Sequence, residues 1–254
     1  MLGIFASTFP RPDLASTLDA VAASGLTGVQ FDFEGGPPEP VRAAFEQRGL
    51  TMAGVSGTYN MAHPDAAVRA AGAKWLDEMI AAAPALGTGV VTLCTGSRDP
   101  DDMWRRHAGN GTPEAWRDRL DTLQTALVTA ERHDVTLAVE PEHGNVIVSP
   151  TAARRLLDEL QTPHLKIIID PANVDLDADA LREAFDLLGD DLVLAHAKDR
   201  RLDGTVVAAG QGDVDYNLYL QLLRDCDVPL ILHGLGEHEV PSAVAFLRRE
   251  GEGP

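Results

Sequence analysis

Three apolar segments in the second half of the chain end in residues that could bind a metal ion. The segments VTLAVE, LKIIID and LVLAH end in Glu140, Asp170 and His196, respectively. Two carboxylates and an imidazole suit a single divalent cation and leave coordination positions open for substrate oxygens. Each residue alone could make a structural hydrogen bond, but the three together predict a shared metal site.

These segments belong to a repeating pattern of short apolar runs separated by longer segments of helical period. Several runs are apolar at consecutive positions, which is typical of strands buried on both faces of a parallel sheet. The pattern predicts strands at residues 2–5, 28–33, 50–55, 89–94, 135–140, 165–170, 192–196 and 229–233.

The segments between the predicted strands carry helix signals. Gly25 follows a helical segment as a C-terminal glycine does, and Thr112-Pro113 is typical of an N-cap followed by a proline in the first turn. Strand and helix alternate eight times without a linker, so residues 1–254 are predicted to form one α/β domain, a (β/α)8 TIM barrel. An open, doubly wound sheet is the alternative, but no GxGxxG follows the first strand.

A (β/α)8 barrel brings the carboxyl ends of its strands to one mouth, where the active sites of this fold lie. In the predicted strands, the first ionisable residue tends to arrive at that end. We therefore expect one site at the mouth, formed by the residues that end five strands: Asp32, Glu140, Asp170, His196 and His233.

The composition argues against several kinds of partner. The formal net charge of −18 disfavours nucleic acid, because that binding depends on Lys and Arg contacting phosphates. Cys94 and Cys226 form no CxxC pair, so neither a disulfide framework nor a cysteine zinc site is expected. The chain opens on an apolar strand with no leader-like segment, and no stretch is long enough for a membrane span, which predicts a soluble, cytoplasmic protein.

Four motifs resemble the xylose isomerase-like superfamily of sugar isomerases and epimerases. VEPEHGN at 139–145 is similar to the segment that carries a metal-binding Glu after the fifth strand. IIDPANV at 168–174 and AHAKD at 195–199 are similar to the D-x-x-[HN] and H-x-K-D motifs after the sixth and seventh strands. AAGQGDVDY at 208–216 resembles the G-x-G-x-[VI]-[DN] segment before the seventh helix, and the resemblance covers the whole chain in element order.

This resemblance implies one divalent ion, Mn²⁺, Mg²⁺, Co²⁺ or Zn²⁺, and a small sugar or polyol substrate. Such an ion polarises the carbonyl of a ketose, acidifies the neighbouring C–H and stabilises the enediolate that forms. In the epimerases that the chain resembles, a Glu of the fifth strand and a Glu of the eighth act on opposite faces of the substrate. The resemblance therefore gives Glu140 a catalytic role as well as a role as metal ligand.

Two residues depart from the pattern of these epimerases. His233 stands where the family places a fourth ligand, a Glu; it can bind metal or carry a proton, while Glu237, four residues later, is an alternative ligand. Because the second Glu is missing, a single-base isomerase or a lyase is favoured over a two-base epimerase. Asn173 stands where related DNA-repair endonucleases need a zinc-binding His, which makes that activity improbable; a hydrogen bond to substrate or to the site is expected instead.

Further polar residues near the motifs could take part. Lys198 is expected to stabilise the developing oxyanion and Asp199 to orient His196, the alternative being an ion pair that locks the loop. His143 is a candidate substrate contact, and His63 either faces the pocket or caps the helix that follows.

The segment 95–112 is long for a loop between a strand and a helix, which favours a lid over the site. Its Trp104 could stack on the apolar face of a sugar, and its Arg98 could bind a phosphate or carboxylate. The charged residues of the segment could instead pair with one another on the surface.

Together these features predict a metal-dependent isomerase or epimerase, with Glu140, His233 and Lys198 as its catalytic residues. A dehydratase of a keto-sugar or keto-inositol would use the same site and is the first alternative. A non-catalytic metal- or sugar-binding barrel is the second. Neither a nucleic acid nor a membrane is expected as a partner, and a homo-oligomer is compatible with the resemblance.

Overall fold

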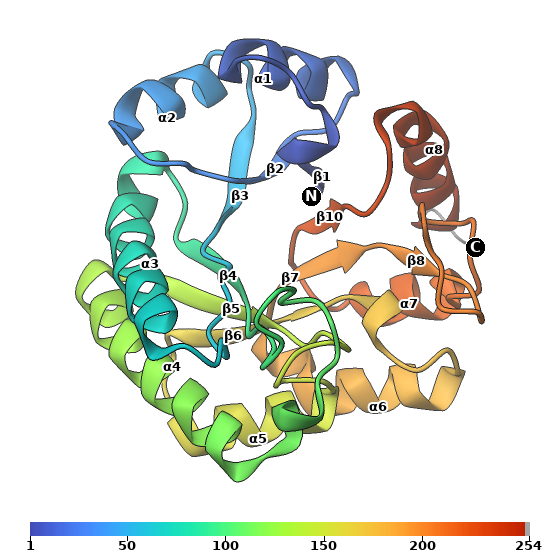
Figure 1. The fold of residues 1–254 in the computed structure, drawn as a ribbon. Helices are drawn as coiled ribbons and strands as arrows, with labels where there is room; N and C mark the ends of the chain where they lie inside the picture. Colours follow the sequence, from blue (N-terminus) through green and yellow to red (C-terminus); the bar gives the residue numbers. More distant parts are fainter. Residues whose placement is uncertain (252–254) are drawn as a thin grey trace.

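The computed structural model describes residues 1–251 and contains eight parallel strands that close into a barrel (Figure 1). The order around the barrel follows the chain, and it closes because β10 pairs with both β7 and β1. The predicted (β/α)8 barrel is therefore confirmed, and closure rules out the open sheet. The barrel strands are β1 (Leu2–Phe5), β2 (Gly28–Phe31), β3 (Thr51–Ser56), β4 (Val90–Cys94), β5 (Thr136–Glu140), β6 (Leu165–Ile169), β7 (Leu192–Ala197) and β10 (Leu230–Leu232).

Eight α-helices within residues 1–251 surround the barrel (Figure 1). The predicted helix ends agree with local chemistry: the Thr112 side chain accepts a hydrogen bond from the backbone N–H of Ala115, and Gly25 takes a φ of 75°, which favours glycine. The helices are α1 (Leu14–Ala23), α2 (Pro38–Glu46), α3 (Ala66–Leu86), α4 (Pro113–His133), α5 (Pro150–Leu160), α6 (Ala178–Leu188), α7 (Tyr216–Leu223) and α8 (Val240–Gly251). None of the helices described is long and apolar enough to span a membrane.

Buried side chains pack on both faces of the barrel sheet, because successive side chains of a strand point to opposite faces, and they form the two main parts of the hydrophobic core. The larger part lies between the barrel and the helices. The smaller part fills the barrel itself and consists of small and branched side chains: Ala53, Ala138, Ile168, Leu194 and Ile231. This inner layer fills the interior of the barrel. The polar residues at the strand ends lie above it and form the floor of the mouth.

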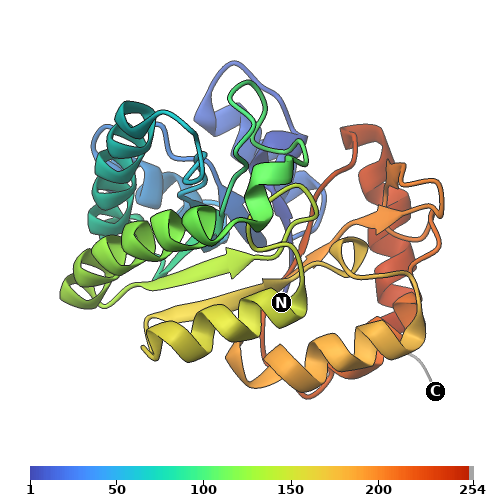
Figure 2. The ribbon, with the colours of Figure 1, turned by 60° about the horizontal axis from the view of Figure 1, so that its bottom comes forward.

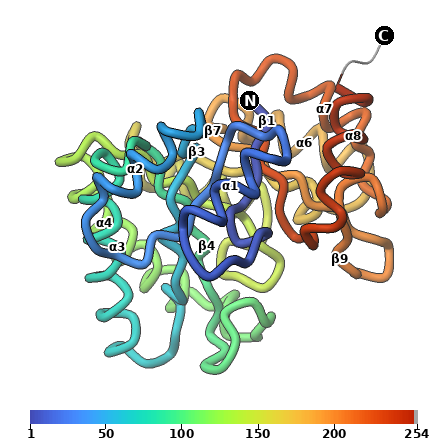
Figure 3. Tube along the Cα trace, turned by 90° about the horizontal axis from the view of Figure 1, so that it is seen from above, coloured from blue at the N-terminus to red at the C-terminus, as the bar shows by residue number. Residues whose placement is uncertain are grey.

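Two irregular segments extend the mouth beyond the strands. The loop of residues 95–112, green in Figure 2, joins β4 to α4 and projects from the barrel. The second segment contains a short antiparallel hairpin of β8 (Asp199–Arg200) and β9 (Val206–Val207), which lies beside α8 (Figures 1 and 3). Both segments follow strands, so they stand on the side of the barrel where the predicted site lies.

A charge network at the opposite end of the barrel gives a prediction about stability. Just before β7, the Asp191 carboxylate accepts hydrogen bonds from Lys166 Nζ at 2.7 Å and Arg154 Nη1 at 2.8 Å. Burial alone would raise the pKa of Asp191, but these two cations lower it below its ordinary 3.8. Its contribution to stability is therefore present at neutral pH and is lost as the pH falls through the lowered pKa.

We expect Asp191→Asn to lower the free energy of unfolding by about 1 kcal/mol at pH 7, with the difference shrinking once Asp191 is protonated in the parent protein. Urea unfolding at pH 7 and at the lowest pH at which the protein stays folded measures this difference. Asp186→Asn, on the exposed face of α6, is the matched control and should change the free energy of unfolding little. A difference that does not depend on pH would contradict this electrostatic explanation.

Candidate metal centre

Four ionisable side chains converge at the ends of four neighbouring strands. Each of them stands two residues after a member of the inner core layer, so strand alternation points it into the barrel just above that layer. The possible ligand atoms of the four all lie within 4.8 Å of one another. These residues are Glu140 at the end of β5, Asp170 after β6, His196 in β7 and His233 after β10.

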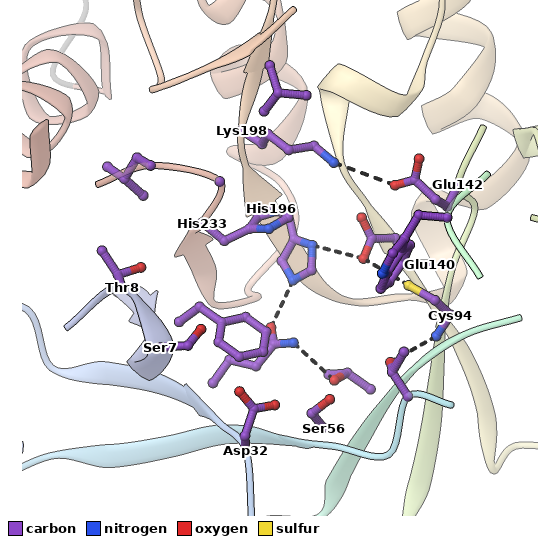
Figure 4. Close-up of a pocket in the computed structure, with 18 of the residues that line it drawn as sticks. Ser7, Thr8, Asp32, Ser56, Cys94, Glu140, Glu142, His196, Lys198 and His233 are labelled. Carbon is purple, nitrogen blue, oxygen red and sulfur yellow. Dashed lines mark hydrogen bonds and ion pairs between the residues drawn. The ribbon is translucent and has the colours of Figure 1, made fainter. Parts of the chain in front are cut away.

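The four side chains form two close pairs. His196 Nδ1 lies 3.2 Å from Glu140 Oε2, and His233 Nε2 lies 2.9 Å from Asp170 Oδ2. The two imidazole rings are 4.3 Å apart between centroids, and all four residues except His233 are buried. Figure 4 shows His196 directed at Glu140 with His233 beside it. The site therefore concentrates two carboxylates and two imidazoles in a volume that one ion can fill.

The geometry of His196 fits a metal ion. Its Nδ1 atom is buried and makes no hydrogen bond, although a Glu140 carboxylate oxygen lies only 3.2 Å away. The lone pairs of His196 Nδ1 and Glu140 Oε2 repel each other at this distance in a buried site, and a cation in contact with both atoms would remove that repulsion. Carboxylate oxygens and imidazole nitrogens are ligands that Mn²⁺, Co²⁺ and Zn²⁺ share. The residues present therefore fit the divalent ion expected from the sequence.

Lys198 supplies a fixed positive charge beside this cluster. Its Nζ lies 3.0 Å from Asp170 Oδ2 and 3.6 Å from Glu142 Oε2, and it donates a hydrogen bond to Asn173 Oδ1 at 3.1 Å. Burial alone would lower the pKa of Lys198, but the surrounding carboxylates raise it, so the side chain is an ammonium. In turn, burial would raise the pKa of Asp170, and the lysine and histidines lower it.

Asn173 connects the lysine to two glutamates. Its Nδ2 donates to Glu140 Oε1 at 3.0 Å and to Glu142 Oε2 at 2.8 Å. Burial, together with the nearby charges of Glu140 and Asp170, raises the pKa of Glu142, whereas Lys198 opposes the rise. The amide therefore holds Glu140 and Glu142 in place while its carbonyl oxygen orients Lys198.

Three residues of the metal-type cluster, Glu140, His196 and His233, line one wall of a cavity of about 830 Å³ at the barrel mouth. Met103 and Trp104 of the loop 95–112 and Val206 and Val207 of the hairpin also line this cavity. Asn145, which follows β5, anchors the loop: its side chain accepts from Gly96 N and donates to Met103 O. The loop thus brings the predicted Trp104 to the cavity.

A second polar wall stands across the cavity from the cluster. Figure 4 shows Ser7, Thr8, Asp32 and Ser56 on this side, where β1, β2 and β3 end. Asp32 is exposed to solvent at the mouth, and partial burial still raises its pKa, with Ser56 opposing the rise. In the closed barrel, β1 to β3 stand opposite β5 to β7, so a carboxylate and hydroxyls face Glu140 and His196 across the cavity.

Two of the predicted substrate contacts lie outside this cavity. Arg98 forms an ion pair with Asp118 of α4, which occupies the guanidinium expected to bind an anion. His63 accepts a hydrogen bond from Asp65 N at 3.0 Å through Nδ1, and its Nε2 lies 3.2 Å from Pro100 O. The N-cap of α3 is Asp65, whose side chain accepts from Ala67 N. His63 therefore takes neither of the two positions expected from the sequence, and instead contacts the turn before α3 and the loop 95–112.

Three other candidates also take positions away from the cavity. The carboxylate of Asp199 accepts backbone N–H bonds from the segment before α7, including Gly210 at 3.0 Å and Gly212 at 2.9 Å, and so fixes that segment rather than contacting His196. His143 is half-buried beside the site and does not line the cavity. Glu237 pairs with Arg11, so His233, and not Glu237, completes the cluster.

Gln30 is a residue of the site that the sequence analysis did not identify. It lies in β2, where its Oε1 is 2.8 Å from His196 Nε2. The only hint in the sequence is a polar residue inside the predicted strand GVQFDF, followed two positions later by Asp32 on the same face.

The fold and the site together define a class: a (β/α)8 barrel with a buried Glu/Asp/His/His cluster of metal-binding type at the carboxyl ends of its strands. The model of the xylose isomerase-like TIM barrel family matches residues 18–249. The chain belongs to this family, as the motifs at the strand ends predicted. None of the curated proteins compared with the chain matches it.

Solved structures of similar fold include two sugar epimerases and a dehydratase. The 3-keto-D-glucoside 4-epimerase YcjR of E. coli is 19% identical with a TM-score of 0.81, and 98% of each chain is covered. The D-psicose 3-epimerase of Clostridium cellulolyticum H10, solved with D-tagatose, is 14% identical with a TM-score of 0.76, covering 99% of each chain. The probable 3-DHS dehydratase AsbF of Bacillus anthracis is 13% identical with a TM-score of 0.79, covering 97% of this chain and 98% of that one.

Proposed function

We propose that the protein is a metal-dependent isomerase or epimerase of a small polyhydroxylated ketone. The observation that carries this proposal is the buried cluster of Glu140, Asp170, His196 and His233, whose His196 Nδ1 is left without a hydrogen bond, at the edge of a cavity of about 830 Å³. Family membership supports the reaction class, and the sugar epimerases of similar fold support a carbonyl sugar as substrate.

A divalent ion held by the four side chains would supply the Lewis acidity that makes a C–H beside a carbonyl acidic. Glu140 is placed to accept that proton, because Asn173 fixes its carboxylate. Burial would raise the pKa of Glu140, but the nearby His196 and Lys198 lower it, which favours the ionised form that a base needs. The Lys198 ammonium is placed to balance the negative charge of the enediolate. Together these side chains provide a base and an electrostatic stabiliser within one wall of the cavity.

A proton must also return to the substrate, and two groups are placed to deliver it. His233 stands beside the cluster, where the resembling epimerases carry a Glu, and its Nε2 contacts Asp170. Asp32 stands on the opposite wall with a raised pKa. If His233 returns the proton, the reaction fits an isomerase. If Asp32 returns it from across the cavity, opposite Glu140, the reaction fits an epimerase that inverts one carbon.

Solvent-deuterium exchange tests the reaction class directly. The protein, loaded in turn with Mn²⁺, Mg²⁺, Co²⁺ and Zn²⁺, is incubated in D₂O with a panel of ketoses and keto-inositols. We expect deuterium at a carbon next to the carbonyl, detected by NMR and mass spectrometry, and loss of exchange after chelation. Absence of exchange with every compound would overturn the proposal and favour the non-catalytic binding barrel.

The charges around the cavity favour a neutral substrate. Asp32, Glu142 and Glu239 line it, and among its described lining residues Lys198 is the one Lys or Arg, already held by Asp170. Arg98, the other expected anion contact, is paired with Asp118. A phosphate group would meet these carboxylates with no unpaired Lys or Arg side chain among the lining residues in the described part of the chain to offset them.

We therefore expect a phosphorylated ketose to bind at least about tenfold more weakly than the free ketose of the same stereochemistry. Competition in the deuterium exchange assay, at two salt concentrations, measures the two affinities. Raising the salt should narrow the difference. Equal or tighter binding of the phosphate ester would show that the cavity contains an anion site that these contacts do not provide.

A dehydratase is a second candidate, and Glu142 is the observation that favours it. Burial raises the pKa of this carboxyl, which favours its acid form, and Lys198 and Asn173 fix its position beside Glu140. A base and an adjacent acid can remove a proton and a hydroxyl from neighbouring carbons. Formation of a conjugated enone, followed by its ultraviolet absorbance, would distinguish this reaction from isomerisation.

A further inference from the structure

We propose that Gln30 fixes His196 in the tautomer whose Nδ1 carries a lone pair, and so prepares this histidine to bind a divalent ion. The proposal rests on the metal site named above and does not depend on the reaction. Gln30 is a positioning residue, because it acts on the ion only through His196.

The contact joins two opposite parts of the barrel. Gln30 Oε1 on β2 lies 2.8 Å from His196 Nε2 on β7, and Gln30 Nε2 donates to Thr92 Oγ1 on β4 at 3.0 Å. All three side chains are buried, with 2–3% of their surface exposed. In this arrangement the amide oxygen accepts the Nε2 proton of His196, which leaves Nδ1 unprotonated in the neutral ring.

The reversed amide would give the other tautomer, and the geometry at Nδ1 opposes it. With the amide nitrogen facing His196, Nε2 would accept and Nδ1 would carry the proton. That proton would then need a partner, and the one carboxylate beside it, Glu140 at 3.2 Å, is not aligned for a hydrogen bond. A buried N–H without a partner is costly, whereas a lone pair at this position is what an ion requires.

Gln30 on β2 and Thr92 on β4 are separated by β3, and the backbone of β3 leaves room for their side chains to meet. The pairing of β2 with β3 skips Ala53, since Val29 pairs with Met52 and Gln30 with Gly54. Gly54 has no side chain, and a Cβ there would lie 3.1 Å from Thr92 Cγ2. A bulge and a glycine on β3 thus give Gln30 and Thr92 the space to meet.

Nitrogen NMR of ¹⁵N-histidine-labelled, metal-free protein reads the tautomer directly, with the His196 signals assigned by their loss in His196→Gln. We expect His196 to be protonated at Nε2 in the parent protein and to lose this preference in Gln30→Met. Protonation at Nδ1 in the parent protein would overturn the proposal.

Binding of Mn²⁺ alone, followed by electron paramagnetic resonance, gives a second readout that needs no substrate. We expect Gln30→Met to weaken Mn²⁺ binding by about 10–100-fold and Thr92→Val to weaken it less, because the latter only frees the amide. Gln30→Glu should restore affinity, since a carboxylate accepts the same Nε2 proton. Thr88→Val, a buried threonine before β4 whose hydroxyl contacts only Val90 N, is the matched control and should bind as the parent does.

Unchanged Mn²⁺ affinity in folded Gln30→Met, or failure of Gln30→Glu to restore it, would also overturn the proposal. If Gln30→Met does not fold, the tautomer of the parent protein and the affinity of Thr92→Val decide the question. A protein with the expected tautomer and Mn²⁺ affinity but no deuterium exchange would contradict the proposed function and leave this inference standing.

Discussion

Glu140→Gln is expected to slow deuterium exchange into the substrate by about 10²–10⁴-fold, the range contributed by a positioned general base. The amide that replaces the carboxylate cannot accept a proton. Its shape preserves the contact with Asn173, but it removes one negative charge from beside His196 Nδ1. The substitution therefore acts on proton transfer and on metal affinity together.

The two effects are separated by measuring exchange at saturating metal, with bound metal quantified in the same sample. Glu131→Gln, an identical substitution on the exposed face of α4, should exchange at the parent rate. Rapid exchange by a metal-loaded Glu140→Gln protein would remove Glu140 as the base and transfer that role to Glu142 or Asp32, which also line the cavity.

Lys198→Met is expected to destabilise the metal-free protein by about 3–5 kcal/mol, because removing one partner of a buried ion pair leaves the other charge without compensation. Lys198 is only 8% exposed, and its ammonium contacts Asp170 and Glu142 while Asn173 fixes its position. The methionine retains most of the volume of the lysine stem, so the loss reports the missing charge rather than a cavity.

A divalent ion should largely reverse this loss, because it supplies positive charge to the same carboxylates. We expect Mn²⁺ to raise the urea midpoint of Lys198→Met more than that of the parent protein. Lys74→Met is the control: this lysine is exposed on α3, and its replacement should change stability by less than about 0.5 kcal/mol. Equal stability of metal-free Lys198→Met and the parent protein would show that the acidic cluster does not need the lysine.

The positions of the metal-type residues could be predicted because two simple rules act together. Parallel strands in a barrel bring their carboxyl ends to one mouth, and strand alternation fixes which residues point inward. Glu140, Asp170, His196 and His233 each follow an inward core residue by two positions, so a linear pattern was enough to place them. The strands could be predicted from the same repeated pattern, and the family from the motifs whose resemblance to it the sequence shows.

Side-chain pairing beyond the strand ends could not be predicted in this way. Arg98 has several acidic neighbours in the sequence, but its partner is Asp118, twenty positions away on α4. The carboxylate of Asp199 is used by backbone N–H groups of a segment whose path depends on the β8–β9 hairpin. Gln30 contacts a histidine 166 residues later, and nothing in its local sequence specifies that contact.

The distribution of residues around the barrel mouth has a consequence for how this fold can change its specificity. The four side chains of the candidate metal site come from the second half of the chain, whereas Ser7, Thr8, Asp32 and Ser56 stand at the ends of β1 to β3 on the facing wall. Recombining the first half with that of another family member should therefore exchange substrate preference while the inherited reaction centre stays intact. The contact between Gln30 and His196 crosses this division. The incoming first half of a functional chimera therefore has to provide a glutamine at the position of Gln30.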